Sequence, residues 1–295
     1  MTEHQQFALI GPGHIGLSLS SLLQNTGYTC TAVVSRTEDG EDEIREHLGD
    51  DVEIYLWDSV EPIHADFILV AVPDDVIHDI GVQLASLYTN SDLKDITFIH
   101  FSGIQDSGVL QPLRDIGHRS ASLHPLQTVP SIAAGKQALT GCAWALEGDS
   151  EELCRQIVDA LDGKLIRLSE EQKVPYHLAA VMASNLLVAL QAMAIDIASE
   201  AGLTQDEFLG VFGPLIRQSL NNLLDNGPGS AISGPLKRAD NSTIERHLDW
   251  LQNADEKYLT VYRELSHYLM EVLLAENVIG LQEVETLTKT LDDTA

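Results

Sequence analysis

Short apolar runs alternate with longer amphipathic stretches between residue 7 and about residue 169 of the chain. Short apolar runs bounded by turn residues are typical of strands, and longer amphipathic stretches are typical of helices. A regular alternation of the two predicts an α/β fold with a parallel, doubly wound sheet. The strands are expected at residues 7–10, 31–35, 67–72, 97–101, 120–123, 143–147 and 165–168.

The strand signal stops after Ser169, and long helical stretches follow to the end of the chain. Ser169 and Gln172 have the spacing of a capping box, and Gly202 stands where a glycine cap ends a helix, so the two bracket one helix of about 30 residues. A chain of 295 residues suits two domains. We therefore predict an N-terminal α/β domain at 1–169 and an all-α C-terminal domain at 170–295.

The stretch 176–198 is apolar around nearly its whole circumference, so a helix there needs covering on all sides. Four polar or charged side chains interrupt it: His177, Asn185, Gln191 and Asp196. Each would cost about 1 to 3 kcal/mol at bilayer depth. The pattern therefore predicts a buried central helix at the interface of a homodimer, and no membrane partner.

The net charge of -28, with only 17 Lys and Arg, lowers the number of plausible partners. A nucleic-acid surface needs many cations to neutralise phosphates, and anionic lipids attract basic segments. We expect no nucleic-acid partner and a small-molecule substrate instead.

The cysteines and the other metal-binding residue types give no sign of a disulfide framework or a metal. Cys30, Cys142 and Cys154 form no CxxC pair, and an odd number favours a reducing compartment. No cluster of His, Cys, Asp and Glu has zinc or calcium ligand spacing, so no metal is predicted. We predict a cytoplasmic protein.

A glycine-rich loop follows the first expected strand and opens the first expected helix: Gly11, Pro12, Gly13, His14, Ile15 and Gly16. GxGxxG in this context fits a Rossmann domain. The first glycine permits a tight turn, the second lets a pyrophosphate approach the backbone, and the third lets helix and strand pack closely. The helix N-terminus then supplies N–H donors and a positive dipole end to a dinucleotide.

The second expected strand ends in Ser35, Arg36 and Thr37, where proteins that bind NAD carry an acidic residue for the ribose. A guanidinium pairs well with a 2′-phosphate, so NADP(H) is favoured over NAD(H). A solvated surface arginine is the alternative. Val72 and Pro73, after a later strand, and Ser102, after the next, are expected to border the same cofactor because ligands lie at the carboxyl ends of such strands.

Five segments of the chain carry a family resemblance: residues 7–16, 71–74, 100–103, 122–127 and 234–240. Together they resemble a Rossmann-like family with a C-terminal helical domain of unknown function. The chain is more distantly similar to pyrroline-5-carboxylate reductase, the deazaflavin-dependent NADP oxidoreductases and the ketopantoate and 6-phosphogluconate dehydrogenase group. The resemblance implies an NADP-binding domain, a helical dimerising domain and a substrate cleft between them.

The hydroxyacid dehydrogenases among these relatives carry Lys and Asn four residues apart on the first helix of the second domain. The resemblance matches Asn185 to the Asn and Val181 to the Lys, so the usual general acid is missing at that position. His177 lies two turns from Asn185 on one broad helix face, and an imidazole can donate a proton at neutral pH. His124, before Pro125, is expected to point toward the nicotinamide, and a structural role is the alternative for each.

Arg238 lies in a basic segment that contains a glycine, and it is a candidate to bind a substrate carboxylate in the cleft of either subunit. The alternative is that this segment is a plain loop between helices. These features predict an NADP(H)-dependent oxidoreductase that transfers hydride to or from a small imine, ketone or hydroxy acid, with catalytic candidates His177, Asn185 and His124. Two other functions stay open. They are a non-catalytic NADP-binding sensor, because Val181 replaces the lysine, and a prephenate-type dehydrogenase of an acidic substrate.

Overall fold

A computed structural model describes residues 5–292, and by its contacts the chain divides after Asn185 into two compact units. In the described part, every strand belongs to the first unit, and the second unit contains helices only. The predicted α/β fold is confirmed. The change from strands to helices falls at 169/170 as expected, but the first helix after it stays with the sheet unit.

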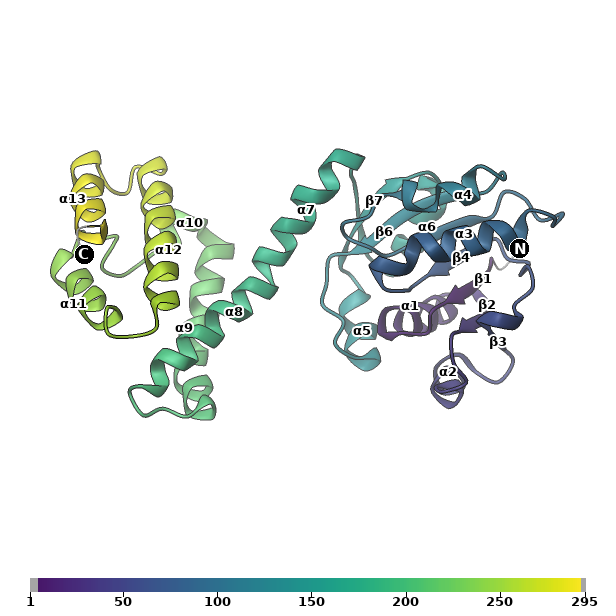
Figure 1. Ribbon diagram of the computed structural model, residues 1–295, viewed down its shortest axis with the longest axis horizontal. Coiled ribbons are helices and arrows are strands. Elements are labelled where there is room, and N and C mark those ends of the chain that lie inside the picture. The colour runs from purple at the N-terminus through teal and green to yellow at the C-terminus, as the bar shows by residue number, and fades with distance from the viewer. Residues whose placement is uncertain (1–4, 293–295) are drawn as a thin grey trace. The chain divides into compact units, whose positions relative to one another are not determined.

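The described residues of the first unit form one eight-stranded sheet, in the order β3-β2-β1-β4-β5-β6-β7-β8 (Figure 1). Its strands are β1 (Gln6–Ile10), β2 (Thr29–Ser35), β3 (Glu53–Leu56), β4 (Phe67–Val70), β5 (Thr97–His100), β6 (Arg119–Pro125), β7 (Ala143–Gly148) and β8 (Lys164–Arg167). The seven expected strands are all present. β3 was not expected, because an edge strand with only partly buried side chains carries a weak apolar signal.

The predicted parallel, doubly wound sheet is confirmed, and one pair of its strands departs from the parallel pattern. β6 and β7 run antiparallel, with Ala121 opposite Gly148 and Pro125 opposite Trp144, whereas the other neighbours are parallel. Apolar periodicity indicates that a segment is a strand, but it does not encode the direction in which that strand enters the sheet. β7 therefore begins at the edge where β6 ends, and β8 runs in the same direction as β7.

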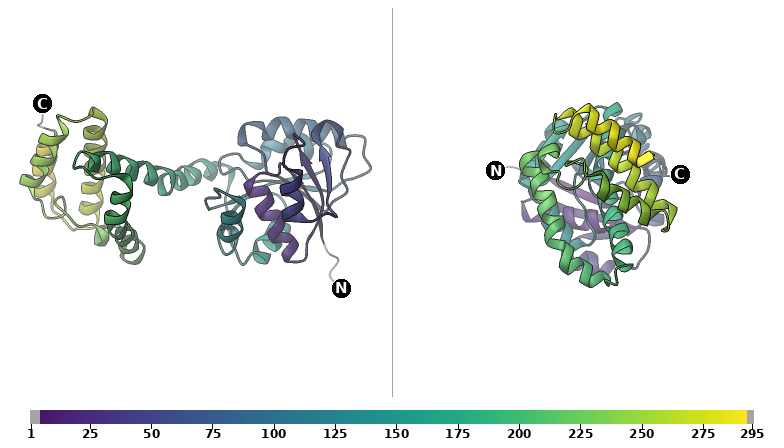
Figure 2. Two further views of the ribbon diagram at one scale, coloured as in Figure 1. Left: turned by 90° about the horizontal axis from the view of Figure 1, so that it is seen from below. Right: turned by 90° about the vertical axis from the view of Figure 1, so that its left-hand side faces the viewer.

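Helices cover both faces of the sheet, as the left view of Figure 2 shows. Alternate residues of β1 enter different cores, with Phe7 and Leu9 on one face and Ala8 and Ile10 on the other. On the first face lie α1 (His14–Asn25), α2 (Glu41–Leu48), α5 (Ile132–Leu139) and α6 (Glu151–Ala160). On the second face lie α3 (Ile77–Tyr88) and α4 (Gln111–Arg114). The first unit also contains three short 3-10 helices, η1 (Trp57–Ser59), η2 (Asp74–Val76) and η3 (Ser107–Leu110).

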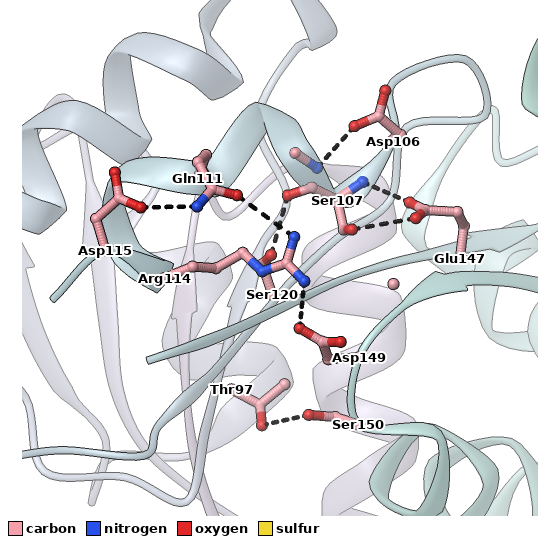
Figure 3. A network of polar contacts seen from close by, with 12 residues as sticks. Thr97, Asp106, Ser107, Gln111, Arg114, Asp115, Ser120, Glu147, Asp149 and Ser150 are labelled. Carbon is pink, nitrogen blue, oxygen red and sulfur yellow. Dashed lines mark hydrogen bonds and ion pairs between the residues drawn. The ribbon is translucent and has the colours of Figure 1, made fainter. Parts of the chain in front are cut away.

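A polar network fastens the antiparallel strand to the rest of the sheet (Figure 3). The backbone N–H of Ser107 donates to the Glu147 carboxylate at 2.5 Å, and Ser120 Oγ donates to the Ser107 carbonyl at 2.9 Å. Arg114 forms an ion pair with Asp149 at 2.5 Å. These bonds join η3 and α4 to β6 and β7, so the end of the sheet is held by side chains as well as by its ladder.

Two helices, α7 (Glu170–Ala183) and α8 (Asn185–Ser199), occupy the stretch where one long helix was expected. The predicted start is confirmed, because the Ser169 N–H donates to Gln172 Oε1 at 2.8 Å. Gly202 adopts φ +84° after α8, as expected for a terminal glycine. Ser184, with φ -122° and ψ -77°, interrupts the helical path between the two.

The second unit continues with five helices in its described part: α9 (Gln205–Asn226), α10 (Pro228–Ala231), α11 (Asn241–Leu251), α12 (Glu256–Ala275) and α13 (Leu281–Asp292). Its core is formed by α11, α12 and α13, where Ile244, Leu248 and Leu273 are fully buried. One helical stretch of the described residues, Glu170–Ser199, is long and apolar enough to cross a membrane by length and composition alone. A core helix of a soluble protein passes the same test.

Candidate functional site

The glycine loop has the geometry that its three glycines predict. Gly11 adopts φ +88°, and a Cβ on it would lie 2.6 Å from the Ala71 carbonyl oxygen. A Cβ on Gly16 would lie 2.5 Å from the Gly11 carbonyl oxygen. Around Gly13, by contrast, no described atom lies within 4 Å of the Cβ position. The outer glycines are therefore required by packing, and the middle one leaves open space at the start of α1.

The first turn of α1 and the end of β4 border this open space. Leu17 is the first residue whose N–H bonds back to Gly13, so the amides of His14, Ile15 and Gly16 have no partner within the helix. The Val72 side chain lies against Gly11. Unpaired amides at a helix N-terminus form a site for an anionic group.

Three residues at the end of β2, Ser35, Arg36 and Thr37, are the candidates for binding the 2′-phosphate of the ribose. Ser35 is buried, and its Oγ donates to the Thr37 carbonyl oxygen at 2.8 Å. Arg36 is exposed and makes no hydrogen bond or ion pair with the part of the chain that the structure describes. The guanidinium and the hydroxyl of the exposed Thr37, whose backbone alone is hydrogen-bonded in the described part of the chain, are therefore available to a ligand.

Ser102 lies after β5, as expected, but its hydroxyl is occupied. Ser102 Oγ donates to the Asp74 carboxylate at 2.8 Å and accepts the N–H of Gln105 at 3.0 Å. Pro73, directly before Asp74, has the extended backbone that leads into η2. The Ser102 N–H donates to His100 Nδ1 and its carbonyl accepts from Ser122 and Lys173, so this buried serine shapes the loop at the sheet edge and its polar groups are all engaged within the chain.

The three predicted catalytic residues line one cavity of about 810 Å³ in the first unit. His124 comes from the carboxyl end of β6, His177 from α7, and Asn185 from the residue after the Ser184 break. Val181, on the same helix, forms part of the apolar wall. The structure thus places on one surface residues that lie about 60 positions apart in the sequence.

Tyr176 holds the ring of His124. The Tyr176 hydroxyl lies 3.0 Å from His124 Nδ1. Burial raises the pKa of Tyr176 to about 12, so the hydroxyl keeps its proton at neutral pH. Burial, with smaller contributions from Lys173 and His177, lowers the pKa of His124 to about 4. The tyrosine and the neutral imidazole therefore share one hydrogen bond, in which either group can be the donor according to the tautomer of the ring.

Gly103 provides room for two imidazole rings. A Cβ on this buried glycine would lie 2.4 Å from His177 Nδ1 and 2.9 Å from His124 Nε2. The two ring centroids are 6.0 Å apart, at 82° to one another. His177 Nδ1 is buried and has no hydrogen-bond partner in the described residues. Two ring nitrogens thus converge on one point at the end of β5.

A lysine that the sequence reasoning missed anchors the helix carrying these residues. The Lys173 side chain is only 1% exposed, and Nζ donates to the Ser102 carbonyl at 2.8 Å and to Ser122 Oγ at 2.5 Å. Burial lowers the pKa of Lys173 to about 8, although nearby carboxylates, of which Glu147 has the largest effect, raise it.

Val181 still occupies the position matched to the lysine of the relatives, and the helix carries its ammonium group two turns earlier, bonded to the sheet edge. The available signal was a lone lysine four residues before His177 in an otherwise apolar helix, which puts both on one face. Arg238, the predicted clamp, belongs to the second unit, where it is 64% exposed and lies 3.9 Å from the Asp240 carboxylate.

The sheet order and the loop geometry are those of a Rossmann-type α/β domain. Residues 3–125 match the Rossmann-like domain family, and residues 142–269 match the family described as Domain of unknown function (DUF2520). The chain therefore combines a Rossmann-like domain with a DUF2520 domain, which confirms the resemblance drawn from its motifs. The search of curated proteins found no match.

Several solved structures share the fold. The Thermotoga maritima protein TM1727 is 24% identical, with 92% of this chain and 99% of that chain covered and a TM-score of 0.71. A candidate NADP oxidoreductase from Bacteroides fragilis is 23% identical, with 91% and 99% covered and a TM-score of 0.69. A pyrroline-5-carboxylate reductase from Coxiella burnetii is 17% identical, with 94% and 100% covered and a TM-score of 0.55. At these identities the likeness establishes the fold.

Replacing the buried lysine with methionine tests its protonation. A lysine whose pKa is about 8 when folded and 10.5 when unfolded opposes folding while it is charged, and this cost is relieved as the pH rises from 8 toward 10.5. Between pH 7 and pH 9.5, the unfolding free energy of the wild type should therefore gain about 2 kcal/mol relative to Lys173→Met. Denaturant titrations at both pH values measure this difference.

The exposed Lys164 provides the control, because the unfolding free energy of Lys164→Met should change with pH as that of the wild type does. Tyrosines and cysteines titrate equally in all three proteins and cancel. If the difference in unfolding free energy between the wild type and Lys173→Met is the same at both pH values, the buried amine has an ordinary pKa.

Proposed function

We propose that this protein is an NADP(H)-dependent oxidoreductase that transfers hydride to or from a small imine, ketone or hydroxy acid. The observation that carries the proposal is the convergence of His124 and His177 over Gly103. That point lies at the carboxyl end of β5, on the same sheet edge as the glycine loop that follows β1. Ligands of open α/β sheets bind at this edge.

The residues of the first unit fit a dinucleotide at three places. The open space over Gly13 and the free amides of α1 suit a pyrophosphate, and the Val72 and Pro73 backbone borders it. Arg36 suits a 2′-phosphate, which favours NADP(H) over NAD(H). The names of two structural neighbours, an NADP oxidoreductase and a pyrroline-5-carboxylate reductase, agree with such a cofactor.

The nicotinamide supplies or accepts the hydride when the cofactor is bound, and the protein has to orient the substrate and handle one proton. His124 Nε2 and the unpaired His177 Nδ1 both lie beside Gly103, and each can donate or accept a hydrogen bond according to the tautomer of its ring. Asn185, the first residue of α8, also lines the cavity, and its side chain can orient a polar substituent of the substrate. Lys173 positions α7 through Ser102 and Ser122.

A purely sensory role is the second candidate function, because Val181 stands where the relatives carry an ammonium group. The two histidines that line the cavity favour catalysis, since an imidazole can take the place of the missing general acid. We also propose that the enzyme works in the cytoplasm, in keeping with three cysteines that are all free and buried.

We further propose that the protein is a homodimer in which a second copy covers the apolar surface of α7. Val174, Leu178 and Met182 recur every fourth residue and are 56% to 59% exposed. Such a continuous apolar stripe on a helix is typical of an interface between subunits. Arg238 is proposed as the carboxylate clamp that one of the two subunits supplies.

Arg36→Ala tests the cofactor. Losing a charged contact to the 2′-phosphate should weaken NADPH binding about 10- to 100-fold and leave NADH binding almost unchanged. Isothermal titration calorimetry with both nucleotides measures the two dissociation constants. Arg246→Ala, at an exposed arginine of α11, is the matched control and should change neither. Equal weakening for NADPH and NADH would argue against a role in phosphate recognition.

His177→Asn and His124→Asn test catalysis. Each should lower turnover by about 100-fold or more, because a positioned donor or base is lost, while NADPH affinity changes by less than about threefold. Cofactor consumption is followed at its absorbance across a panel of small ketones and imines, and in reverse with hydroxy acids. His64→Asn, at an exposed histidine, is the control. Full activity in both site variants would disprove the assigned roles.

Charges on α7 test the assembly. The wild type should have twice the 32.2 kDa chain mass by light scattering, and Leu178→Glu with Met182→Glu should reduce it to one chain mass because the buried charges oppose association. Val82→Glu, at an exposed apolar residue of α3, should leave the dimer intact. A monomeric wild type, or one that sediments with lipid vesicles, would contradict the proposal.

A further inference from the structure

Along α7, the wall of the 810 Å³ cavity changes from polar to apolar and back to polar. His177 lines the cavity first, Val181 follows four residues later, and Asn185 stands just beyond the end of the helix. Residues four apart lie in one row on a helix, so Val181 stands about 6 Å along the axis from His177. This wall therefore presents an isopropyl group between an imidazole and a carboxamide.

Small or apolar residues surround Val181 in the same cavity. They come from α7 and from the loop between β6 and α5: Ala179, Ala180, Ala183, Leu126, Val129 and Pro130. Alanine side chains leave room in front of the helix, and a volume of about 810 Å³ is several times the roughly 150 Å³ that holds a benzene molecule. The cavity therefore has room for a sizeable apolar group beside the reacting atoms.

Val181 belongs to the cavity and not to the exposed apolar stripe of α7. It is partly buried, whereas Leu178 and Met182 are 56% and 59% exposed. The ammonium group of Lys173, on the same helix, is bonded to the Ser102 carbonyl and to Ser122 and does not line the cavity. A carboxylate against Val181 would therefore lose water without gaining a cation from α7, whereas an apolar group gains by leaving water.

We infer that Val181 is a specificity-determining residue, and that the substrate places an apolar substituent, branched aliphatic or aromatic, against it. The reacting group lies toward His124 and His177, and a carboxylate bound by Arg238 belongs to another end of the molecule. Where the relatives carry a lysine, this chain thus has an isopropyl group that contacts the body of the substrate. The inference rests on the proposed function and narrows its substrates to those with an apolar body.

Paired substrates test the apolar substituent. The pairs are 2-oxo acids, their imines and their hydroxy acids, and the two members of a pair have equal length and end in an isopropyl group or in a carboxylate. Both members keep the carboxylate beside the reacting carbon, so the contact proposed for Arg238 is the same. Turnover of NADP(H) should give the isopropyl member a kcat/KM at least about 10-fold higher, because the apolar wall leaves the second carboxylate without a partner.

Substitutions at Val181 test which residue sets this preference. Val181→Lys should reverse it, because an ammonium group replaces the isopropyl group in the wall. Val181→Thr keeps the volume and adds a hydroxyl, so it should weaken the preference by about threefold or more, and it serves as the test if the lysine variant does not fold. Val82→Lys, at an exposed valine of α3, is the matched control and should keep the wild-type preference.

Methyl NMR tests the contact without any turnover. In protein with ¹³C-labelled valine methyl groups and bound NADPH, the hydroxy acids cannot react because the cofactor is already reduced. The hydroxy acid that ends in an isopropyl group should shift the Val181 signals, which are assigned by their loss in Val181→Ile. The member that ends in a carboxylate should not shift them at the same concentration, and the signals of Val82 should stay in place with both.

A wild type that prefers the carboxylate members, or that does not distinguish the two, would overturn the inference and leave the proposed oxidoreductase standing. NADPH binding with no turnover of any pair would instead contradict the proposed function itself. The Val181 methyl signals separate the two failures, because they report the contact whether or not a substrate reacts. The inference fails if both hydroxy acids shift these signals equally or if neither does.

Discussion

One buried ammonium group joins helix α7 to the carboxyl edge of the sheet. Lys173 Nζ reaches the Ser102 carbonyl after β5 and Ser122 Oγ on β6, and its side chain is almost completely removed from solvent. Leaving a buried charge without these partners would cost several kcal/mol, so the two bonds strongly favour one position for the start of α7. Tyr176 and His177 follow on the next turn, and their placement beside the sheet depends on that anchor.

The absence of a side chain at Gly103 is the second constraint. His124 and His177 approach it from two different elements, and any Cβ there would collide with both rings. The lysine brings the helix to the sheet edge, and the glycine lets the rings meet there. The hydroxyl of Tyr176 then holds the ring of His124 through Nδ1. The lysine anchor, the space at the glycine and this hydrogen bond thus depend on one another, and each is a short contact between residues distant in the sequence.

The geometry of the glycine loop before α1 depends much less on distant parts of the fold than the histidine site does. Gly11 and Gly16 make their close contacts with one another and with the Ala71 region, and the strand and helix on either side were evident from the apolar pattern. The sequence therefore predicted both the loop and its surroundings. The candidates His124, His177 and Asn185 were also found from their positions after a strand and on an apolar helix. Lys173 was not, because a lysine in sequence is normally a solvated residue.

The sequence by itself determined seven of the eight strands, the glycine loop, the start of α7 and the α/β class, because each depends on local periodicity or on capping spacing. Only the tertiary structure decided the antiparallel entry of β7, the burial of Lys173 and the pairing of Tyr176 with His124. Strand direction, burial and hydrogen-bond partners depend on where distant segments meet in space. The composition of the chain and the local spacing of its residues do not encode these long-range contacts.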